Sequence, residues 1–327
     1  MHAKIFIISN ILGGEKVGFR YDLLFSLAKS KGMNKTQLRE AAGISTSTLA
    51  KLSKNEDVGM DVLGKLCACL NCQPGDILTF EVDRFNPLLH VLREEKAMNL
   101  KGGIYHATQI KLAYNSNHIE GSKLTEDQTR YIFETNTIGV EDTSEILNID
   151  DIIETINHFD AFRYLLTIAE DDLSENIIKE FHKILKRGTS DSRKEWFKVG
   201  DYKLRANEVG GRETSLPEEV EADMKRLLLD YHLKKDKSIE DLIDFHYRFE
   251  RIHPFQDGNG RVGRLILFKE CLKFGFVPII IEDQYKLFYY RGLKEFESEK
   301  GYLADTCLHG QDMYESLMKY FRVPIRN

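Results

Sequence analysis

The chain has 327 residues, of which 42% are apolar and 30% are charged, with a formal net charge of −6 and five cysteines. This length allows two domains or one large one, and the apolar share is enough for a packed core. The acidic balance excludes general polyanion binding by the whole chain, so any nucleic-acid contact needs a local patch. No apolar run reaches membrane-spanning length, and the scattered cysteines predict a reducing, cytoplasmic location without membrane contact.

The first 16 residues differ in pattern from the helical segments after them. They include KIFIISNILGG, which has only a short apolar run and lacks the small-residue cleavage pattern of a signal peptide. We expect an extension of unknown structure at 1–16. Short helical segments with brief turns then predict a helical domain at 17–82.

A helix-turn-helix pattern lies in the stretch KTQLREAAGISTSTLAKLSKNE. Leu38 and Ala42 give one apolar helical face, Gly43 ends that helix, and Ser45 is suited to cap the next one. Two short helices joined by a glycine-containing turn are typical of DNA-binding motifs. The segment resembles the Cro/C1-type domains, which implies a five-helix-type domain that binds palindromic DNA as a homodimer.

In such domains the N-terminal residues of the second helix meet base edges in the major groove. The residues that the resemblance places on DNA are Ser45, Thr46, Ser47 and Lys51 at the groove and Gln37 near phosphate. Charge does not decide the matter, because eight basic and seven acidic residues between 17 and 81 nearly cancel. The alternative is a helical module for dimerisation or protein contact.

Three cysteines cluster in this domain, at Cys67, Cys69 and Cys72. A zinc site needs a fourth ligand at suitable spacing, and the apolar stretch VLGKLCACLNC supplies none. We therefore interpret them as small core residues.

The second domain begins at Asn86-Pro87, where the pattern is interrupted, and extends over 86–327. Its amphipathic stretches predict helices at Pro87–Met98, Ile104–Asn115, Ile149–Ala169, Glu175–Leu185, Pro217–Leu233, Ile239–Ile252 and Val262–Phe274. Between them, FKVGDYKLRANEVGGRETSLP alternates Tyr202, Leu204 and Ala206 before a turn at Gly210-Gly211, which predicts a small β-hairpin. The fold class is mainly α.

The stretch HPFQDGNGRVGR, residues 253–264, contains the G-x-G-x-x-G spacing of dinucleotide-binding loops. That fingerprint requires a buried strand before the glycines. Here an amphipathic helix precedes them and is stopped by Pro254. A Rossmann unit is therefore excluded, and a Walker loop is excluded because the stretch has no Gly-Lys-Ser/Thr.

The same stretch still has the features of an anion site. Gly258, Asn259 and Gly260 can present consecutive N–H groups, and a helix beginning near Arg261 adds its N-terminal dipole. Arg261 and Arg264 are three residues apart and share the first turn of that helix. Two cations at a helix N-terminus indicate a bound polyanion.

Two further residues complete the chemistry. Asp257 would repel a phosphate unless a divalent ion lay between them, and Mg²⁺ is the usual ion. His253 is the titratable group suited to proton abstraction near neutral pH. The pattern predicts phosphoryl or nucleotidyl transfer from a nucleoside triphosphate to a hydroxyl.

The stretch matches the Fic signature His-x-Phe-x-Asp/Glu-Gly-Asn-Gly-Arg-x-x-Arg at every specified position, so 86–327 resembles the Fic family. Most members transfer AMP from ATP, with Mg²⁺, to protein hydroxyls, and the predicted hairpin resembles their target-docking flap. The implied roles are base for His253, loop anchor for Phe255, metal ligand for Asp257, α- and β-phosphate contacts for Gly258, Asn259 and Gly260, phosphate contact for Arg261 and γ-phosphate contact for Arg264. Tyr289 or Tyr290 either walls the adenine pocket or packs in the core.

A second stretch, SNHIEG, resembles the inhibitory Ser/Thr-x-x-x-Glu-Gly/Asn helix of the family. It places an inhibitory helix around 110–121, with Ser116, Glu120 and Gly121 as its motif residues. A glutamate near a helix C-terminus opposes the dipole, so a partner cation is expected. In the family that partner corresponds to Arg264.

Together these patterns predict an autoinhibited protein adenylyltransferase with a DNA-binding module. The donor is ATP, and the acceptor is a Tyr, Thr or Ser hydroxyl of a target protein or of the chain itself. One alternative is a transcription regulator whose Fic domain senses nucleotide. Another is a Fic enzyme that removes AMP or performs other phosphotransfer.

Overall fold

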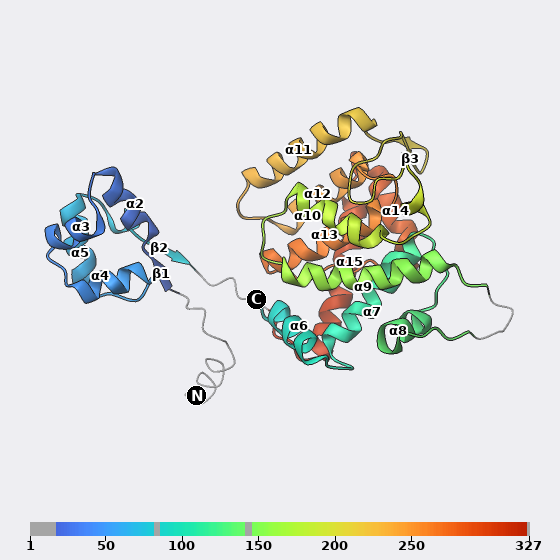
Figure 1. Ribbon diagram of the computed structural model, residues 1–327, viewed down its shortest axis with the longest axis horizontal. Coiled ribbons are helices and arrows are strands. Elements are labelled where there is room, and N and C mark those ends of the chain that lie inside the picture. The colour runs from blue at the N-terminus through green and yellow to red at the C-terminus, as the bar shows by residue number, and fades with distance from the viewer. Residues whose placement is uncertain (1–17, 82–85, 141–145, 326–327) are drawn as a thin grey trace. The chain divides into compact units, whose positions relative to one another are not determined.

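The computed structural model describes residues 18–81, 86–140 and 146–325, and the predicted extension at 1–16 lies outside these ranges. The chain divides into two compact units, Met1–Phe85 and Asn86–Asn327. Both are mainly helical (Figure 1). In the described ranges, no helix is both long enough and apolar enough to cross a bilayer.

The first unit is a helical domain closed by a pair of short strands. Its elements are β1 (Gly18–Arg20), α2 (Asp22–Ser30), α3 (Lys35–Ala41), α4 (Thr46–Ser53), α5 (Met60–Leu70), the 3-10 turn η1 (Pro74–Asp76) and β2 (Thr79–Glu81). β1 and β2 pair antiparallel, with Phe19 opposite Phe80. The sequence did not predict this pair because three-residue strands are too short to show a period of two.

The core of this unit explains the helical pattern. Leu24, Leu38, Leu52 and Leu66 come from the four α-helices and are completely buried. The three clustered cysteines are free thiols whose side chains pack against this core. The fifth helical segment is the 3-10 turn η1, not an α-helix.

The second unit contains the remaining elements. They are α6 (Pro87–Met98), α7 (Ile104–Ile119), α8 (Glu126–Thr135), α9 (Ile149–Thr167), α10 (Glu175–Lys186), η2 (Asp191–Arg193), β3 (Glu208–Val209), β4 (Arg212–Glu213), α11 (Pro217–Leu233), α12 (Ile239–Ile252), α13 (Asn259–Phe274), η3 (Asp283–Tyr285), α14 (Lys286–Glu295) and α15 (Gly301–Tyr320). All seven predicted helices are present, and α7 and α13 are longer than predicted.

Three helices were missed. The α8 helix has a detectable start, because Thr125 and Gln128 form a capping box. The α14 helix carries apolar residues on its solvent side, where Leu287 is 75% exposed, so its amphipathic pattern is weak. The α15 helix could have been predicted, because it is long and carries apolar residues such as Leu303 and Tyr314, which the structure buries.

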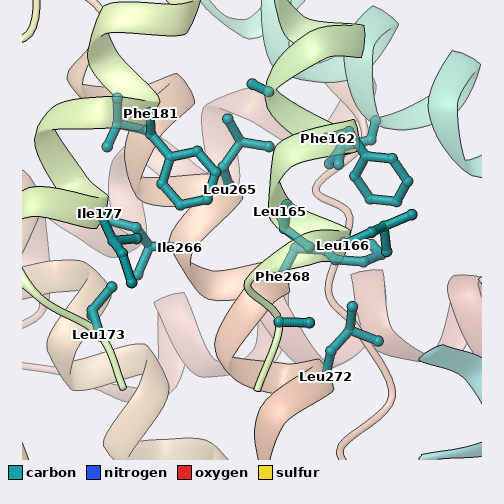
Figure 2. Close-up of a cluster of buried hydrophobic side chains, with 14 of the residues drawn as sticks. Phe162, Leu165, Leu166, Leu173, Ile177, Phe181, Leu265, Ile266, Phe268 and Leu272 are labelled. Carbon is teal, nitrogen blue, oxygen red and sulfur yellow. The ribbon is translucent and has the colours of Figure 1, made fainter. Parts of the chain in front are cut away.

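The helix α13 is the centre of the second unit. Every residue from Asn259 to Leu272 is buried, and the helix contacts α7, α9, α10 and α12. Figure 2 shows Phe268 of α13 among Phe162 and Leu166 of α9, with Phe181 of α10 packed beside Leu265. A charged residue on this helix therefore has no solvent to face and needs partners from its neighbours.

The predicted hairpin is present but shorter than its alternation suggested. β3 and β4 flank Gly210 and Gly211, which have φ of +57° and +73°. Two consecutive positive φ values suit the twist of a tight hairpin. The alternating stretch from Tyr202 to Ala206 lies outside the strands, and its backbone instead bonds to the segment after α12.

Candidate active site

The loop between α12 and α13 has a backbone set by three residues. α12 ends at Ile252, and its C-cap His253 adopts a left-handed conformation with φ of +52° and donates its N–H to the Phe249 carbonyl at 3.0 Å. Pro254 cannot continue the helix. Gly258, with φ of +82°, is the N-cap of α13. The signature residues therefore lie in one short loop after α12 and in the first turns of α13.

The interior of the loop is braced by Asn259 and Phe255. The Asn259 side-chain oxygen accepts from the Phe255 N–H, and its amide nitrogen donates to the Phe255 carbonyl, both at 2.8 Å. The Phe255 ring is completely buried, as an anchor requires. Asn259 is also buried and uses its amide on the loop itself, while its role as a phosphate contact stays a prediction.

His182 of α10 supports the loop from behind. Its Nδ1 accepts the Gly200 N–H at 2.9 Å, which leaves the proton on Nε2 to be donated to the Asp257 carbonyl at 3.1 Å. Its ring lies parallel to the Phe255 ring with centroids 4.0 Å apart. Burial and the nearby Lys186 lower the pKa of His182 to about 3, so this tautomer is neutral across the physiological range.

The anion site expected at Gly258, Asn259 and Gly260, here called the anion cradle, differs in backbone conformation from the prediction. Of Gly258, Asn259 and Gly260, Gly258 alone has a positive φ, while the other two open α13. The first intrahelical bond of α13 runs from the Val262 N–H to the Gly258 carbonyl. The N–H groups before it lack carbonyl acceptors within the helix. The anion-binding feature is thus a helix N-terminus behind one left-handed glycine.

Asp257 and Arg261 belong to a network of four charges. Lys186 of α10 bonds to Glu154 of α9 at 2.5 Å and to Asp257 at 2.6 Å. Arg261, whose side chain is 3% exposed, pairs with Glu154 and, at 3.2 Å, with Asp257. Each carboxylate thus contacts both cations, which offsets the cost of burying them.

This network determines the protonation state of the Asp257 carboxyl group. Burial alone would raise its pKa, but Arg261 and Lys186 hold the pKa well below its usual range. Both ion pairs use Oδ2, and the side chain remains 46% exposed. An ionised, half-exposed carboxylate beside the cradle fits Mg²⁺, which takes one or two protein carboxylates plus phosphate oxygens.

Arg264 is bound by the end of α7. Its guanidinium donates to the Ser116 hydroxyl at 3.0 Å, to the Ser116 carbonyl at 2.8 Å and to Glu120 Oε1 at 2.7 Å. Burial lowers the pKa of Arg264, and the Glu120 carboxylate more than reverses this effect. The two stretches singled out in the sequence, 148 and 144 residues apart in these pairs, therefore meet in one contact.

Glu120 also covers the cradle. A Cβ added to Gly260 would lie 2.1 Å from Glu120 Oε1. The carboxylate thus sits directly against the first turn of α13, where the free N–H groups are. Gly121, with φ of +100°, turns the chain away after α7, and Tyr290 holds the same helix end by donating its hydroxyl to the Ile119 carbonyl.

His253 lies in this turn as a neutral base. Burial and then the Lys203 cation lower its pKa to about 4. Among the described residues its Nδ1 has no hydrogen-bond partner. An imidazole that is neutral near pH 7 can accept a proton from a hydroxyl.

Behind Arg264 lies a second layer of titratable groups. Tyr289 is buried in the core and its hydroxyl pairs with His246 Nε2 at 2.7 Å, whereas Tyr290 is partly exposed. Core packing is therefore the role that fits Tyr289. Glu250 of α12 has its pKa raised to about 8 by burial, with Arg264 opposing and Glu120 adding to the shift.

In the first unit, two of the predicted DNA-contacting side chains take part in helix capping. Gln37 is part of the capping box of α3 with Asn34, and Ser45 caps α4 by accepting the Thr48 N–H at 3.1 Å. Thr46, Ser47 and Lys51 are exposed on α4 with Gln37 and Ser45 exposed nearby. Capping does not prevent a DNA contact, but it gives Gln37 and Ser45 a second reason to be there.

Sequence reasoning missed Glu154, Lys186, His182, Lys203 and Glu250. Lys186 ends an amphipathic helix, where a lysine normally complements the dipole in solvent. Glu154 looks like one more acid in a charged helix. Nothing in the local pattern distinguishes these residues from surface charges, because their partners come from other helices.

Two parts of the chain match known family models. Residues 172–270 match the Fic/DOC family, and residues 24–83 match the Cro/C1-type HTH DNA-binding domain. Protein adenylyltransferase Fic from Nematostella vectensis is 30% identical over 190 residues, 56% of this chain and 42% of that protein. Protein adenylyltransferase fic-1 from Caenorhabditis elegans is 27% identical over 220 residues, 64% of this chain and 40% of that protein. The chain spans less than half the length of these relatives.

Solved structures show the same fold. A Fic domain containing signaling protein from Bacteroides thetaiotaomicron aligns with a TM-score of 0.56 and 24% identity, covering 73% of this chain and 98% of that one. A fragment of Fic-1 from Caenorhabditis elegans aligns with a TM-score of 0.56 and 19% identity, covering 98% of this chain and 94% of that one.

Proposed function

Because this chain carries a Fic/DOC domain behind a Cro/C1-type helix-turn-helix domain, we propose that it is a protein adenylyltransferase whose resting state is autoinhibited. The donor is ATP, and the acceptor is a Tyr, Thr or Ser hydroxyl on a target protein or on the chain itself. Support comes from the adenylyltransferase names of its relatives and from a loop that brings a neutral base beside an anion cradle.

The residues divide the reaction between them. The ATP phosphates lie at the N-terminus of α13, with Arg264 at the γ-phosphate. His253 accepts the proton of the incoming hydroxyl as its oxygen bonds to the α-phosphorus and the bond to the leaving pyrophosphate breaks. Asp257 would hold Mg²⁺, which supplies charge neutralisation for the phosphates. Asn259 and His182 keep the loop in shape.

One observation carries the autoinhibition: the Glu120 carboxylate lies against Gly260 in the first turn of α13 and pairs with Arg264. A γ-phosphate cannot use Arg264 while Glu120 holds it. ATP would then bind with displaced phosphates, and the α-phosphate would not lie in line with an incoming hydroxyl. Displacement of Glu120 from Arg264 is therefore the activating step.

The test is the intact mass of the protein after incubation with ATP and Mg²⁺. We expect a gain of one AMP or more on the chain itself, larger for Glu120→Gly than for the unmutated protein. Parallel incubations with GTP, CTP and UTP define the donor. If Glu120→Gly gains no nucleotide and modifies no protein in a cell extract, the transferase proposal is wrong.

We also propose that the helix-turn-helix domain binds a palindromic DNA site as a homodimer. The exposed N-terminal turn of α4, with Thr46 and Ser47, is the surface that supports this proposal. Half-sites about one DNA turn apart are expected. Footprinting that protects no site, or binding that is indifferent to sequence, would assign this domain to protein contact instead.

A further inference from the structure

We propose that Lys203, on the segment leading into the hairpin, is a positioning residue that holds the backbone on both sides of His253 and places a cation beside its imidazole. The inference rests on the proposed role of His253 as the base. It extends that role to a residue that does not touch the reacting atoms.

The backbone contacts bracket the histidine. The Lys203 N–H donates to the carbonyl of Pro254 at 2.9 Å, and its Nζ lies 3.5 Å from the carbonyl of Ile252. These are the residues directly after and before His253. A left-handed conformation is unfavourable for a residue with a side chain, so it persists where the surroundings fix it. Lys203 supplies contacts on either side of that residue.

The same amine joins the two arms of the hairpin. Nζ donates to Asn207 Oδ1 before β3 and to Thr214 Oγ1 after β4, both at 2.7 Å. The Thr214 hydroxyl in turn donates to the Asn207 carbonyl at 2.8 Å, and the Asn207 amide donates to the Phe255 carbonyl at 3.2 Å. A displacement of the hairpin would therefore reach the backbone around His253 through the side chains of Lys203 and Asn207.

The charge of this amine is unusual for its position. Lys203 is 2% exposed, and the acceptors that the described residues offer to Nζ are all neutral. Burial lowers its pKa to about 8, so the amine is mainly protonated at pH 7 and loses its proton as the pH rises through 8. The buried cation is kept close to His253 without a carboxylate to neutralise it.

That cation opposes the acids around His253. Glu120 from α7 and Asp257 from the loop raise the pKa of the imidazole, as does its contact with the Glu250 backbone in α12, whereas burial and Lys203 lower it. The phosphates of ATP would add further negative charge nearby. Without Lys203, the pKa of the imidazole would lie closer to neutral, so a larger fraction would be protonated and unable to accept a proton from the acceptor hydroxyl.

The test is the pKa of His253, measured by NMR titration of histidine-labelled protein without nucleotide. His253→Ala identifies the resonance. In the unmutated protein we expect a pKa well below the ordinary 6.5. Lys203→Met should raise it by on the order of one unit, because a like charge close to an ionisable group shifts it by that amount or more. Lys203→Arg should keep it low, and Lys198→Met, an exposed lysine on the same segment, should leave it unchanged.

Two results would overturn the inference: a His253 pKa at or above 6.5 in the unmutated protein, or an unchanged pKa in Lys203→Met. Lys203→Gln, which keeps a donor, replaces Lys203→Met if the latter does not fold, with the same criterion. Because no AMP transfer enters this measurement, the inference can fail while the transferase proposal stands, and the reverse.

Discussion

The catalytic turn and the helix-turn-helix carry polar residues in opposite environments. Arg261 and Arg264 in the turn are buried and held by carboxylates from α9 and α7, hundreds of bonds away along the chain. Ser45 and Lys51 in the helix-turn-helix are exposed, and Ser45 bonds within its own helix. The difference teaches that contacts within the fold already hold the arginines of residues 253–264, whereas the side chains proposed to contact DNA remain exposed to solvent.

Loss of the base should produce the largest effect. His253→Ala, made in the Glu120→Gly protein, should lower AMP transfer by ~10²–10⁴-fold, because a general base contributes about that much. ATP binding should stay close to unmutated, since the imidazole acts on the hydroxyl and not on the phosphates. Labelled-AMP incorporation and nucleotide binding by calorimetry measure the two separately. AMP transfer at the rate of the Glu120→Gly protein would show that His253 is not the general base.

Breaking the four-charge network should destabilise the fold. Lys186→Met leaves Glu154 and Asp257 with one cation fewer in a buried site, which typically costs ~3–5 kcal/mol of unfolding free energy. The control is Lys183→Met on the same helix, whose side chain is 61% exposed and whose removal should change stability by less than ~1 kcal/mol. Urea titration compares them, and equal losses would mean that the network is not what stabilises the turn.

The helix-turn-helix should respond through binding instead of stability. Lys51→Ala should weaken binding to the DNA site by ~1–3 kcal/mol if the lysine reaches a base. It should leave the urea midpoint of the first unit unchanged, because the side chain is exposed. Footprinting titrations measure the loss. Unchanged affinity would show that Lys51 does not contact the DNA.

The smallest effect is expected at the cap of α4. Ser45→Ala removes the bond to the Thr48 N–H and should destabilise the first unit by ~1 kcal/mol. Ser45→Asp should restore most of this loss, because aspartate also caps helices. Thermal unfolding of the full chain, followed at the transition assigned to the first unit, compares the three proteins. A neutral Ser45→Ala would show that the cap does not limit the stability of this helix.

The two regions also differ in what their sequences disclose. The stretch 253–264 was predictable because it matches the Fic signature at every specified position, and the contact of SNHIEG with Arg264 because this stretch resembles the inhibitory helix of the family. The contacts inside this stretch were not predictable. The Asn259 side chain bonds to the loop backbone, and of Gly258, Asn259 and Gly260 only Gly258 is left-handed. Such choices depend on the helices packed around α13.

Lys186 and Lys203 show most clearly which residues local sequence cannot identify as buried. Each stands in a segment rich in exposed lysines, and local sequence gives both the pattern of a solvated charge. One is buried by α9 and the loop, the other by the hairpin and the end of α12. The two-residue length of the hairpin strands and the pairing of β1 with β2 could not be predicted either, because they are set by tertiary contacts and not by periodicity.

The most direct test of the account compares labelled-AMP incorporation by the unmutated protein, Glu120→Gly and Arg264→Ala. Freeing the cradle should let the α-phosphate align with the hydroxyl, and misplacement of this kind costs ~10²-fold or more. The account predicts that Glu120→Gly incorporates far more AMP than the unmutated protein, while Arg264→Ala does not, because it frees the glutamate but removes the phosphate clamp. Equal incorporation by the unmutated protein and Glu120→Gly would contradict it.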